Sequence, residues 1–253
     1  MSGSLIIAGL GPGAAHLITP EVAAALAEAT DLIGYAPYVA RVAERAGLVR
    51  HGSDNREELD RASHALRLAA QGKRVVVVSS GDPGVFAMAA AVFEAVDAGD
   101  PAWRELDIKV LPGISAMFAA AARIGAPLGH DFCAINLSDN LKPWELVQHR
   151  LRLAAQAGFV IALYNPLSKA RPWQLGRALD LLREELPGHV PVIFASAISD
   201  AREAIDTVPL GEAVAERADM RTLVMIGSTH TKLIERAAGK PFVYTPRSVG
   251  VSS

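Results

Sequence analysis

The sequence from Val75 to Ala89, VVVVSSGDPGVFAMA, carries the clearest indication of the architecture. Four consecutive β-branched residues predict a buried strand, Ser-Ser-Gly-Asp-Pro-Gly predicts a tight turn, and the alanine-rich run after it predicts a helix. A strand that is apolar on both sides is typical of a central parallel strand covered by helices on both faces. Ligands of such sheets bind outside the carboxyl ends of the strands, so the turn from Ser79 to Gly84 is expected at a binding site.

The residues of this turn suit a ligand-binding loop. Gly81 and Gly84 allow the backbone to approach a ligand closely, and Pro83 stiffens the loop. Asp82 is its one charged side chain. An isolated G-D-P-G is most simply a well-formed turn between a strand and a helix. Similar turns at the ends of other expected strands favour a binding role instead, and they lie at 9–13, 112–116 and 165–171.

Composition and charge narrow the class of protein. The chain has 253 residues, of which 51% are hydrophobic and 21% charged, so it is globular and long enough for one large α/β domain or two smaller ones. A formal charge of -2 gives no overall reason to bind nucleic acid or an anionic membrane, and neither is expected as a partner. With Cys133 as the single cysteine, an internal disulfide is excluded. We expect a cytoplasmic protein, because no signal segment precedes the first strand.

A shift in composition at Gly125–Gly129, with two glycines and a proline in five residues, predicts a domain boundary. We therefore expect two α/β domains, an N-terminal domain at 1–124 and a C-terminal domain at 125–253. In the second domain an alternating stretch at 203–208 predicts an antiparallel strand, and 242–244 predicts an edge strand. This domain is expected to contain a mixed sheet with helices.

One glycine pattern raises the alternative of a nicotinamide-dependent oxidoreductase. The sequence from Gly9 fits G-x-G-x-x-G/A, and Asp31 lies at about the right distance for a ribose contact. However, the signal for the following helix comes later, at Thr19 and Pro20, and Asp31 precedes its strand instead of ending it. The seven histidines lack paired ligand spacing, so no metal site is expected. The turns also lack the lysine of a P-loop, and their few charges suit a compact uncharged or cationic ligand.

Four blocks carry a resemblance to a known family. They are GLGPG at 9–13, SGDPG at 80–84, PGISA at 112–116 and LYNP at 163–166. In order and spacing they resemble the tetrapyrrole, or class III, S-adenosylmethionine-dependent methyltransferases, and the resemblance covers nearly the whole chain. It implies the tetrapyrrole methylase fold, with S-adenosylmethionine in a cleft between two α/β domains, a tetrapyrrole substrate and usually a homodimer.

Within that family, further blocks resemble the branch that methylates precorrin-3B at C17 in cobalamin biosynthesis. These blocks are Gly34-Tyr35 with Tyr38-Val39, 78–85, 136–139 with 142–144, and 162–172. The implied reaction adds a methyl group and contracts the ring to give precorrin-4. Alternatives are the cobalt-precorrin-3 reaction of the anaerobic route, methylation at another precorrin position, or a non-catalytic protein that kept the cofactor cleft.

The resemblance also implies site residues. Cofactor contacts are expected at Pro12, Ser80, Gly81, Asp82, Val85, Ser115, Ala116, Asn165 and Ala197. Methyl transfer from a sulfonium is an in-line displacement in which positioning supplies most of the catalysis, so no nucleophilic side chain is required. Ring contraction requires proton transfers, and the unranked candidates are Asp82, His16, His130 and Asp139. The carboxylates of the substrate are expected to meet Lys142, Arg150, Lys169 and Arg171.

Overall fold

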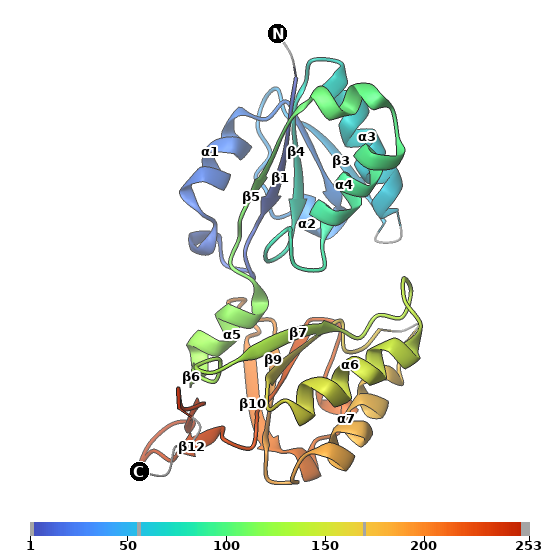
Figure 1. Cartoon of the computed structure of the whole chain (residues 1–253). Helices are drawn as coiled ribbons and strands as arrows, with labels where there is room; N and C mark the ends of the chain where they lie inside the picture. Colours follow the sequence, from blue (N-terminus) through green and yellow to red (C-terminus); the bar gives the residue numbers. More distant parts are fainter. Residues whose placement is uncertain (1–2, 55–56, 169–170, 249–253) are drawn as a thin grey trace. The chain divides into compact units, whose positions relative to one another are not determined.

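The computed structural model describes residues 3–54, 57–168 and 171–248, and the chain forms two compact units, Met1–Ser115 and Ala116–Ser253 (Figure 1). Both contain a sheet with helices, as the α/β prediction requires. The units separate nine residues before the expected boundary, because helix α5 (Ala116–Ile124) packs against strands of the second unit. No helix in the described part of the chain is long and apolar enough to cross a membrane.

The first unit is built on a five-stranded sheet in the order β3-β2-β4-β1-β5, in which all neighbours are parallel. The strands are β1 (Ser4–Gly9), β2 (Asp31–Tyr35), β3 (Val49–Ser53), β4 (Arg74–Ser79) and β5 (Asp107–Leu111). The valine-rich strand predicted from the sequence is β4, and it occupies the centre, between β2 and β1. Its carboxyl end places the turn that follows Ser79 at the same edge as the loops after β1 and β5.

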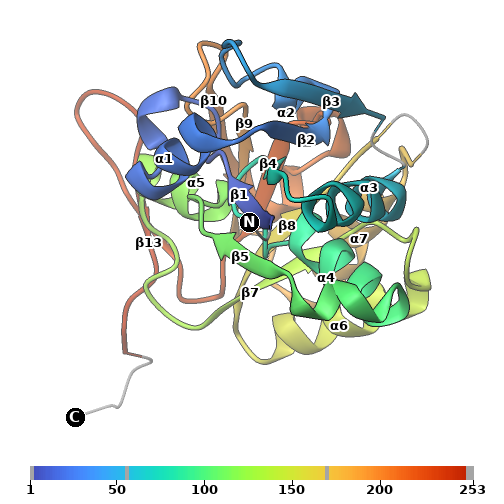
Figure 2. The ribbon, with the colours of Figure 1, turned by 90° about the horizontal axis from the view of Figure 1, so that it is seen from above.

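Helices cover both faces of this sheet. They are α1 (Pro20–Glu28), α2 (Ala36–Val39), α3 (Glu58–Ala70) and α4 (Met88–Ala98), and the 3-10 helices are η1 (Ala15–Leu17) and η2 (Pro101–Glu105). Val75 and Val77 pack with α3 and α4, and Val76 and Val78 pack on the opposite face with α1. Figures 1 and 2 show α1 on one side of β4 and α3 on the other. Because all four valines are buried, each contributes roughly 2 kcal/mol of hydrophobic stabilisation.

The helices of the first unit can be compared with their local sequence. The Thr19 side chain caps α1, since its hydroxyl accepts a hydrogen bond from the amide of Val22 at 3.3 Å. Helix α3 buries one apolar face, which contains Ala62, Leu66 and Ala69, whereas Leu59 in its first turn is 55% exposed. The aromatic segment at 35–38 runs from the end of β2 into the short helix α2.

The second unit contains a mixed five-stranded sheet in the order β10-β9-β11-β8-β7. Its strands are β7 (Phe132–Asn136), β8 (Val160–Tyr164), β9 (Pro191–Ser196), β10 (Ala204–Pro209) and β11 (Thr222–Ile226). Helices α6 (Trp144–Gln156) and α7 (Gln174–Glu185) pack on one face, and α5 packs on the other (Figure 1). Strand β10 is antiparallel to β9, as predicted.

A small third sheet corrects one expectation. The stretch at 242–244 is strand β13 (Phe242–Tyr244), which pairs with β12 (Lys232–Ile234) and β6 (Gly125–Ala126) in the order β12-β13-β6. It is therefore not an edge strand of the large sheet. The remaining 3-10 helices are η3 (Leu210–Glu212) and η4 (Ala215–Arg217).

Candidate functional site

The loops after β1, β4 and β5 touch through glycine backbone at the carboxyl edge of the first sheet. Gly11 donates to the carbonyl of Gly81 at 3.2 Å, and Gly81 donates back to the carbonyl of Gly11 at 2.9 Å. A Cβ at Gly9 would lie 2.6 Å from the Gly81 oxygen, and a Cβ at Gly113 would lie 2.2 Å from the same atom. Side chains are therefore excluded where the loops meet, and backbone groups line this part of the edge.

The Asp82 carboxylate links two of these loops. Its Oδ1 accepts the amide hydrogen of Gly84 at 2.8 Å, and its Oδ2 accepts that of Gly113 at 3.0 Å. Both oxygens therefore hold backbone, one within the loop after β4 and one in the loop after β5. This arrangement fits a group that fixes loop geometry.

Arg41, which the sequence analysis missed, holds the same loops from the side of α2. Its guanidinium donates to the carbonyl oxygens of Leu10 at 2.7 Å, Gly13 at 3.1 Å and Gly11 at 3.3 Å, and to Ser80 Oγ at 3.4 Å. Burial lowers the pKa of this guanidinium. A single arginine outside any motif gives no signal in the sequence, because its partners are backbone atoms about 30 residues away.

The remaining predicted residues of the first unit lie on or beside these loops. Pro12, Ser80 and Val85 are partly buried on the loops after β1 and β4, and Ser115 is buried after β5. His16 is exposed in η1, just past the loop at 9–13. The first unit thus brings its predicted cofactor residues to one edge of one sheet.

Asp31 occupies the wrong place for a nicotinamide ribose. It is the first residue of β2, at the amino end of the strand, whereas the glycine loops lie at the carboxyl edge. The residue is only 4% exposed, and its carboxylate accepts from Thr30 Oγ1 at 2.8 Å and lies 2.9 Å from His51 Nε2. The carboxylate is therefore engaged within the protein.

In the second unit, Asn165 and Ala197 directly follow β8 and β9, two parallel-running strands that end at the same edge. Both have left-handed backbone, with φ of 50° and 49°. Such strain, roughly 1–3 kcal/mol per residue, is often found at functional sites. The Asn165 amide donates to Asn136 Oδ1 at 3.1 Å, which ties the end of β8 to the end of β7.

Three cations expected to meet substrate carboxylates lie near one another in the second unit. Lys142 Nζ donates to the Ser138 carbonyl at 2.9 Å, and Arg171 donates to the hydroxyl of the same residue. Burial lowers the pKa of the Lys142 ammonium, and the charge of Arg150 acts in the same direction. Asp139 raises this pKa and Arg171 lowers it. Among the described residues, Lys142 thus lies in the field of two arginines and of the Asp139 carboxylate, and this excess of positive charge suits an anionic ligand.

The two acid–base candidates of this unit do not lie together. Asp139 follows β7, where its carboxylate accepts from Gln174 Nε2 at 3.1 Å. His130 precedes the same strand, so the five residues of β7 separate them by about 15 Å. Lys169 lies outside the described residues. Among those described, no group of three or more His, Cys, Asp or Glu is placed to hold a metal ion.

A parallel α/β unit with glycine-packed loops, followed by a mixed α/β unit, defines a class of ligand-binding α/β protein. The sequence profile of the Tetrapyrrole (Corrin/Porphyrin) Methylases matches residues 4–214, and the chain belongs to this family. It is 60% identical over 247 residues to a precorrin-3B C(17)-methyltransferase of a Sinorhizobium species, covering 98% of this chain and 97% of that protein.

Solved structures agree with this assignment. The crystal structure of the methyltransferase CobJ is similar with a TM-score of 0.92 and 59% identity, over 97% of this chain and 100% of that one. A uroporphyrin-III C-methyltransferase of Thermus thermophilus, complexed with S-adenosylhomocysteine, has a TM-score of 0.66 at 20% identity, over 89% and 92% of the two chains. The second likeness shows the fold alone. The expected family, fold and enzyme class are confirmed: the chain is a tetrapyrrole methylase, an enzyme class that uses S-adenosylmethionine.

Proposed function

We propose that this methylase transfers a methyl group from S-adenosylmethionine to C17 of precorrin-3B and contracts the ring to precorrin-4 in cobalamin biosynthesis. The observation that carries the proposal is the 60% identity to the precorrin-3B C(17)-methyltransferase across nearly the full length of both proteins. The cobalt-precorrin-3 reaction is the first alternative, because a probable cobalt-factor III C(17)-methyltransferase of Salmonella typhimurium is 35% identical over 95% of this chain. Methylation at another precorrin position is the second alternative.

The residues of the loop edge fit the cofactor. The contact of Gly9, Gly81 and Gly113 leaves backbone groups in a place that a Cβ would fill, and no lysine or arginine lies within the turns at 9–13 and 79–84. The Arg41 guanidinium that reaches these loops is engaged by their carbonyl oxygens. Such a surface suits a cationic sulfonium with hydroxyls and an amine better than a polyphosphate. The residues proposed to hold it are Pro12, Ser80, Gly81, Asp82, Val85, Ser115, Ala116, Asn165 and Ala197.

The mechanism that these residues support is one of positioning. When bound, S-adenosylmethionine supplies an electrophilic methyl group whose leaving group departs neutral. The chain then has to hold the donor and the acceptor carbon in line and exclude water, and neither task needs a nucleophile. Arg41 and Asp82 fix the loops that would perform this alignment.

Substrate recognition and proton transfer are assigned to other groups. We propose that Lys142, Arg150 and Arg171 bind carboxylates of the tetrapyrrole. The proposal is supported by the hydrogen bonds of Lys142 and Arg171 to the same residue, Ser138, and by the pKa of Lys142, which burial and then the charges of Arg150 and Arg171 lower. The carboxylate of Asp82 is occupied by two amides, which favours loop fixing over proton transfer there. His16, exposed beside the loop at 9–13, is then the first acid–base residue to test.

The decisive experiment is incubation of the protein with S-adenosylmethionine and precorrin-3B, followed by mass and absorption spectra of the pigment. One added methyl group together with the spectrum of a contracted ring supports the proposal. Methyl transfer only to a cobalt-loaded substrate supports the alternative route. Tight binding of S-adenosylhomocysteine without turnover on any precorrin favours a non-catalytic role, and an unchanged reduced-nicotinamide fluorescence rejects the oxidoreductase.

We further propose a homodimer, which rests on the family resemblance, and a cytoplasmic location, as expected from the sequence. Light scattering coupled to size-exclusion chromatography measures the first directly, because the monomer mass is 26.7 kDa. Fractionation of the source cells measures the second.

A further inference from the structure

The turn after β9 holds two residues in a conformation that side chains rarely adopt. Ala197 has φ of 49° and Ser199 has φ of 64°, and neither is glycine. Left-handed backbone at such residues persists only where the surroundings hold it in place. The turn contains backbone hydrogen bonds from Asp200 to Ala197 and from Glu203 to Asp200, both of 3.0 Å.

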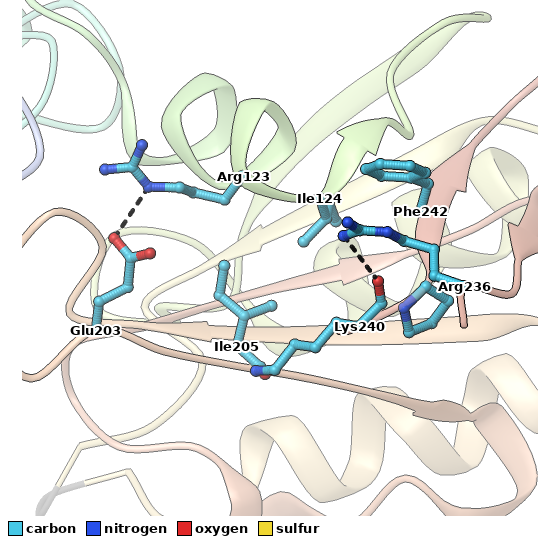
Figure 3. A pocket seen from close by; sticks show the side chains of 8 residues that line it. Arg123, Ile124, Glu203, Ile205, Arg236, Lys240 and Phe242 are labelled. Carbon is cyan, nitrogen blue, oxygen red and sulfur yellow. Dashed lines mark hydrogen bonds and ion pairs between the residues drawn. The ribbon is translucent and has the colours of Figure 1, made fainter. Parts of the chain in front are cut away.

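One carboxylate oxygen outside these backbone bonds also restrains the turn. Glu203 Oε2 accepts the amide hydrogen of Ser199 at 2.6 Å and the Nε hydrogen of Arg123 at 3.1 Å. Arg123 is the next-to-last residue of α5, so the pair joins the end of this helix to the turn. Figure 3 shows the Arg123 side chain reaching from the helix toward Glu203.

The other end of α5 is fixed as well. The amide of Met117, in its first turn, donates to the hydroxyl of Tyr164 at 3.3 Å, and Tyr164 is the last residue of β8. Helix α5 is therefore tied to the end of β8 at its start and to the β9 turn at its end. The three cofactor contacts proposed in this unit are Ala116, Asn165 and Ala197, and each lies at one of these ties.

The space beside the ion pair is a cavity of about 280 Å³, not packed core. Arg236 lies over the ring of Phe242, 4.4 Å from its centre, across the cavity from the pair (Figure 3). The Arg123–Glu203 pair lines this cavity and joins α5 to the residue before β10, and Ile124 of α5 also packs in one apolar cluster with Ile198 of the turn. The residues lining the cavity are Arg123, Ile124, Glu203, Ile205, Arg236, Lys240, Pro241 and Phe242.

We propose that Glu203 and Arg123 are positioning residues for S-adenosylmethionine. They hold the left-handed turn in the conformation that places Ala197, together with Ala116 at the start of α5, to contact the cofactor. The inference rests on the proposed function, because it takes Ala197 and Ala116 as cofactor contacts. In this proposal Glu203 and Arg123 act through the turn and need not contact the cofactor themselves.

The test measures S-adenosylhomocysteine binding by calorimetry for a series of variants. Glu203→Ala removes the acceptor for both Ser199 and Arg123, and its Kd is expected to rise about tenfold, which corresponds to about 1.4 kcal/mol. Glu203→Gln keeps an oxygen for both donors and is expected within about threefold of wild type. Arg123→Ala leaves the Ser199 bond in place and gives an intermediate loss, and Arg123→Lys restores part of it.

Arg152→Ala is the matched control. Its side chain is 42% exposed, against 45% for Arg123, and it pairs with Glu184 and Glu185 between α6 and α7, where no cofactor residue is proposed. This control is expected to bind S-adenosylhomocysteine as wild type does. Steady-state kinetics provide a second readout: the KM for S-adenosylmethionine rises in Glu203→Ala, while the KM for the tetrapyrrole does not.

The outcomes separate this inference from the proposed function. Wild-type protein that fails to bind S-adenosylhomocysteine removes the cofactor assignment and this inference with it. Wild type that binds, together with unchanged affinity in Glu203→Ala and Arg123→Ala, overturns the positioning role alone. A lowered Tm with unchanged Kd also overturns it, since the pair would then serve stability only. If Glu203→Ala fails to fold, Arg123→Ala decides the question: an intermediate loss of affinity supports the positioning role, and wild-type affinity overturns it.

Discussion

Asp82 Oδ2 accepts the amide hydrogen of Gly113 at 3.0 Å, and this bond joins the loop after the central strand to the loop after β5. The two loops also touch through Gly81 and Gly113, where no Cβ fits. The carboxylate therefore joins two loops whose backbones are already in close contact. A small shift of either loop would move the backbone that is proposed to face the cofactor.

Replacement of Asp82 with alanine is expected to impair methyl transfer more than folding. The loss of two hydrogen bonds from backbone amides to the carboxylate is expected to cost about 1–2 kcal/mol of stability. Transfer and S-adenosylhomocysteine affinity should fall at least about tenfold, because the loop after β5 loses its tether. Urea unfolding and single-turnover methyl transfer measure the two effects. Near-normal turnover in this variant would remove Asp82 from the site.

Arg41→Met tests the clamp on the loop after β1. The variant removes the guanidinium donors to the carbonyls of Leu10, Gly11 and Gly13 and leaves only the Gly81 amide on the Gly11 carbonyl, so we expect about tenfold weaker S-adenosylhomocysteine binding. Arg45→Met is the control, since Arg45 also donates to backbone carbonyls, but at the end of α1. Calorimetry on both variants should show the loss for Arg41→Met alone; equal affinities would contradict the clamp.

The central strand and the loop edge were predictable because their signals are local. Four adjacent valines predict β4, and the glycines of each loop directly follow their strand in the sequence. The binding edge of the first sheet can therefore be predicted from short segments of sequence. Strand β3, VRHGS, was missed because it lies at an edge and contains no apolar run. Helix α5 was assigned to the first domain because an alanine-rich helix does not reveal which sheet it covers.

The interactions that fix the site were not predictable, because they join residues distant in sequence. Arg41 acts on a loop about 30 positions earlier, and Arg123 pairs with Glu203, 80 positions later. The sequence predicts Tyr164 only as the end of a strand. Its hydrogen bond from the Met117 amide depends on how α5 packs, which the sequence does not indicate. Sequence motifs indicate which backbone segments are expected to approach a ligand. The side chains that hold these segments in place lie outside the motifs and are therefore not indicated by them.

Arg150→Gln tests the proposed carboxylate site. Partial burial lowers the pKa of the Lys142 ammonium, and the charge of Arg150 lowers it further. An anionic group of the substrate would therefore interact favourably with both cations. The variant should raise the KM for the tetrapyrrole about fivefold while S-adenosylhomocysteine affinity stays constant. Arg152→Gln, on the same helix and with the same change of charge, should leave both values unchanged. A tetrapyrrole KM that is equal in the two variants would place the carboxylate site elsewhere.

His64 gives the fold a dependence on pH that can be measured without substrate. Burial lowers the pKa of His64 from its ordinary 6.5, and the neighbouring His51 and Arg67 lower it further, while Asp31 raises it. His64 Nε2 lies 3.3 Å from His51 Nδ1. Between pH 6.5 and the lower native pKa, this imidazole is protonated in the unfolded chain and remains neutral in the native state. Stability from His64 is thus complete above pH 6.5 and is lost as the pH falls through 6.5 toward the lower native pKa.

The measurement is the urea midpoint at pH 7.5 and at pH 5.5. Wild type should lose stability between the two, and His64→Gln should lose less, because glutamine does not titrate. His149→Gln, which changes an exposed histidine on α6, should lose as much as wild type. Comparing each variant with itself removes the effect of the lost contact to His51, which is present at both pH values. Equal losses in wild type and His64→Gln would show that the lowered pKa of His64 does not contribute to stability in this range.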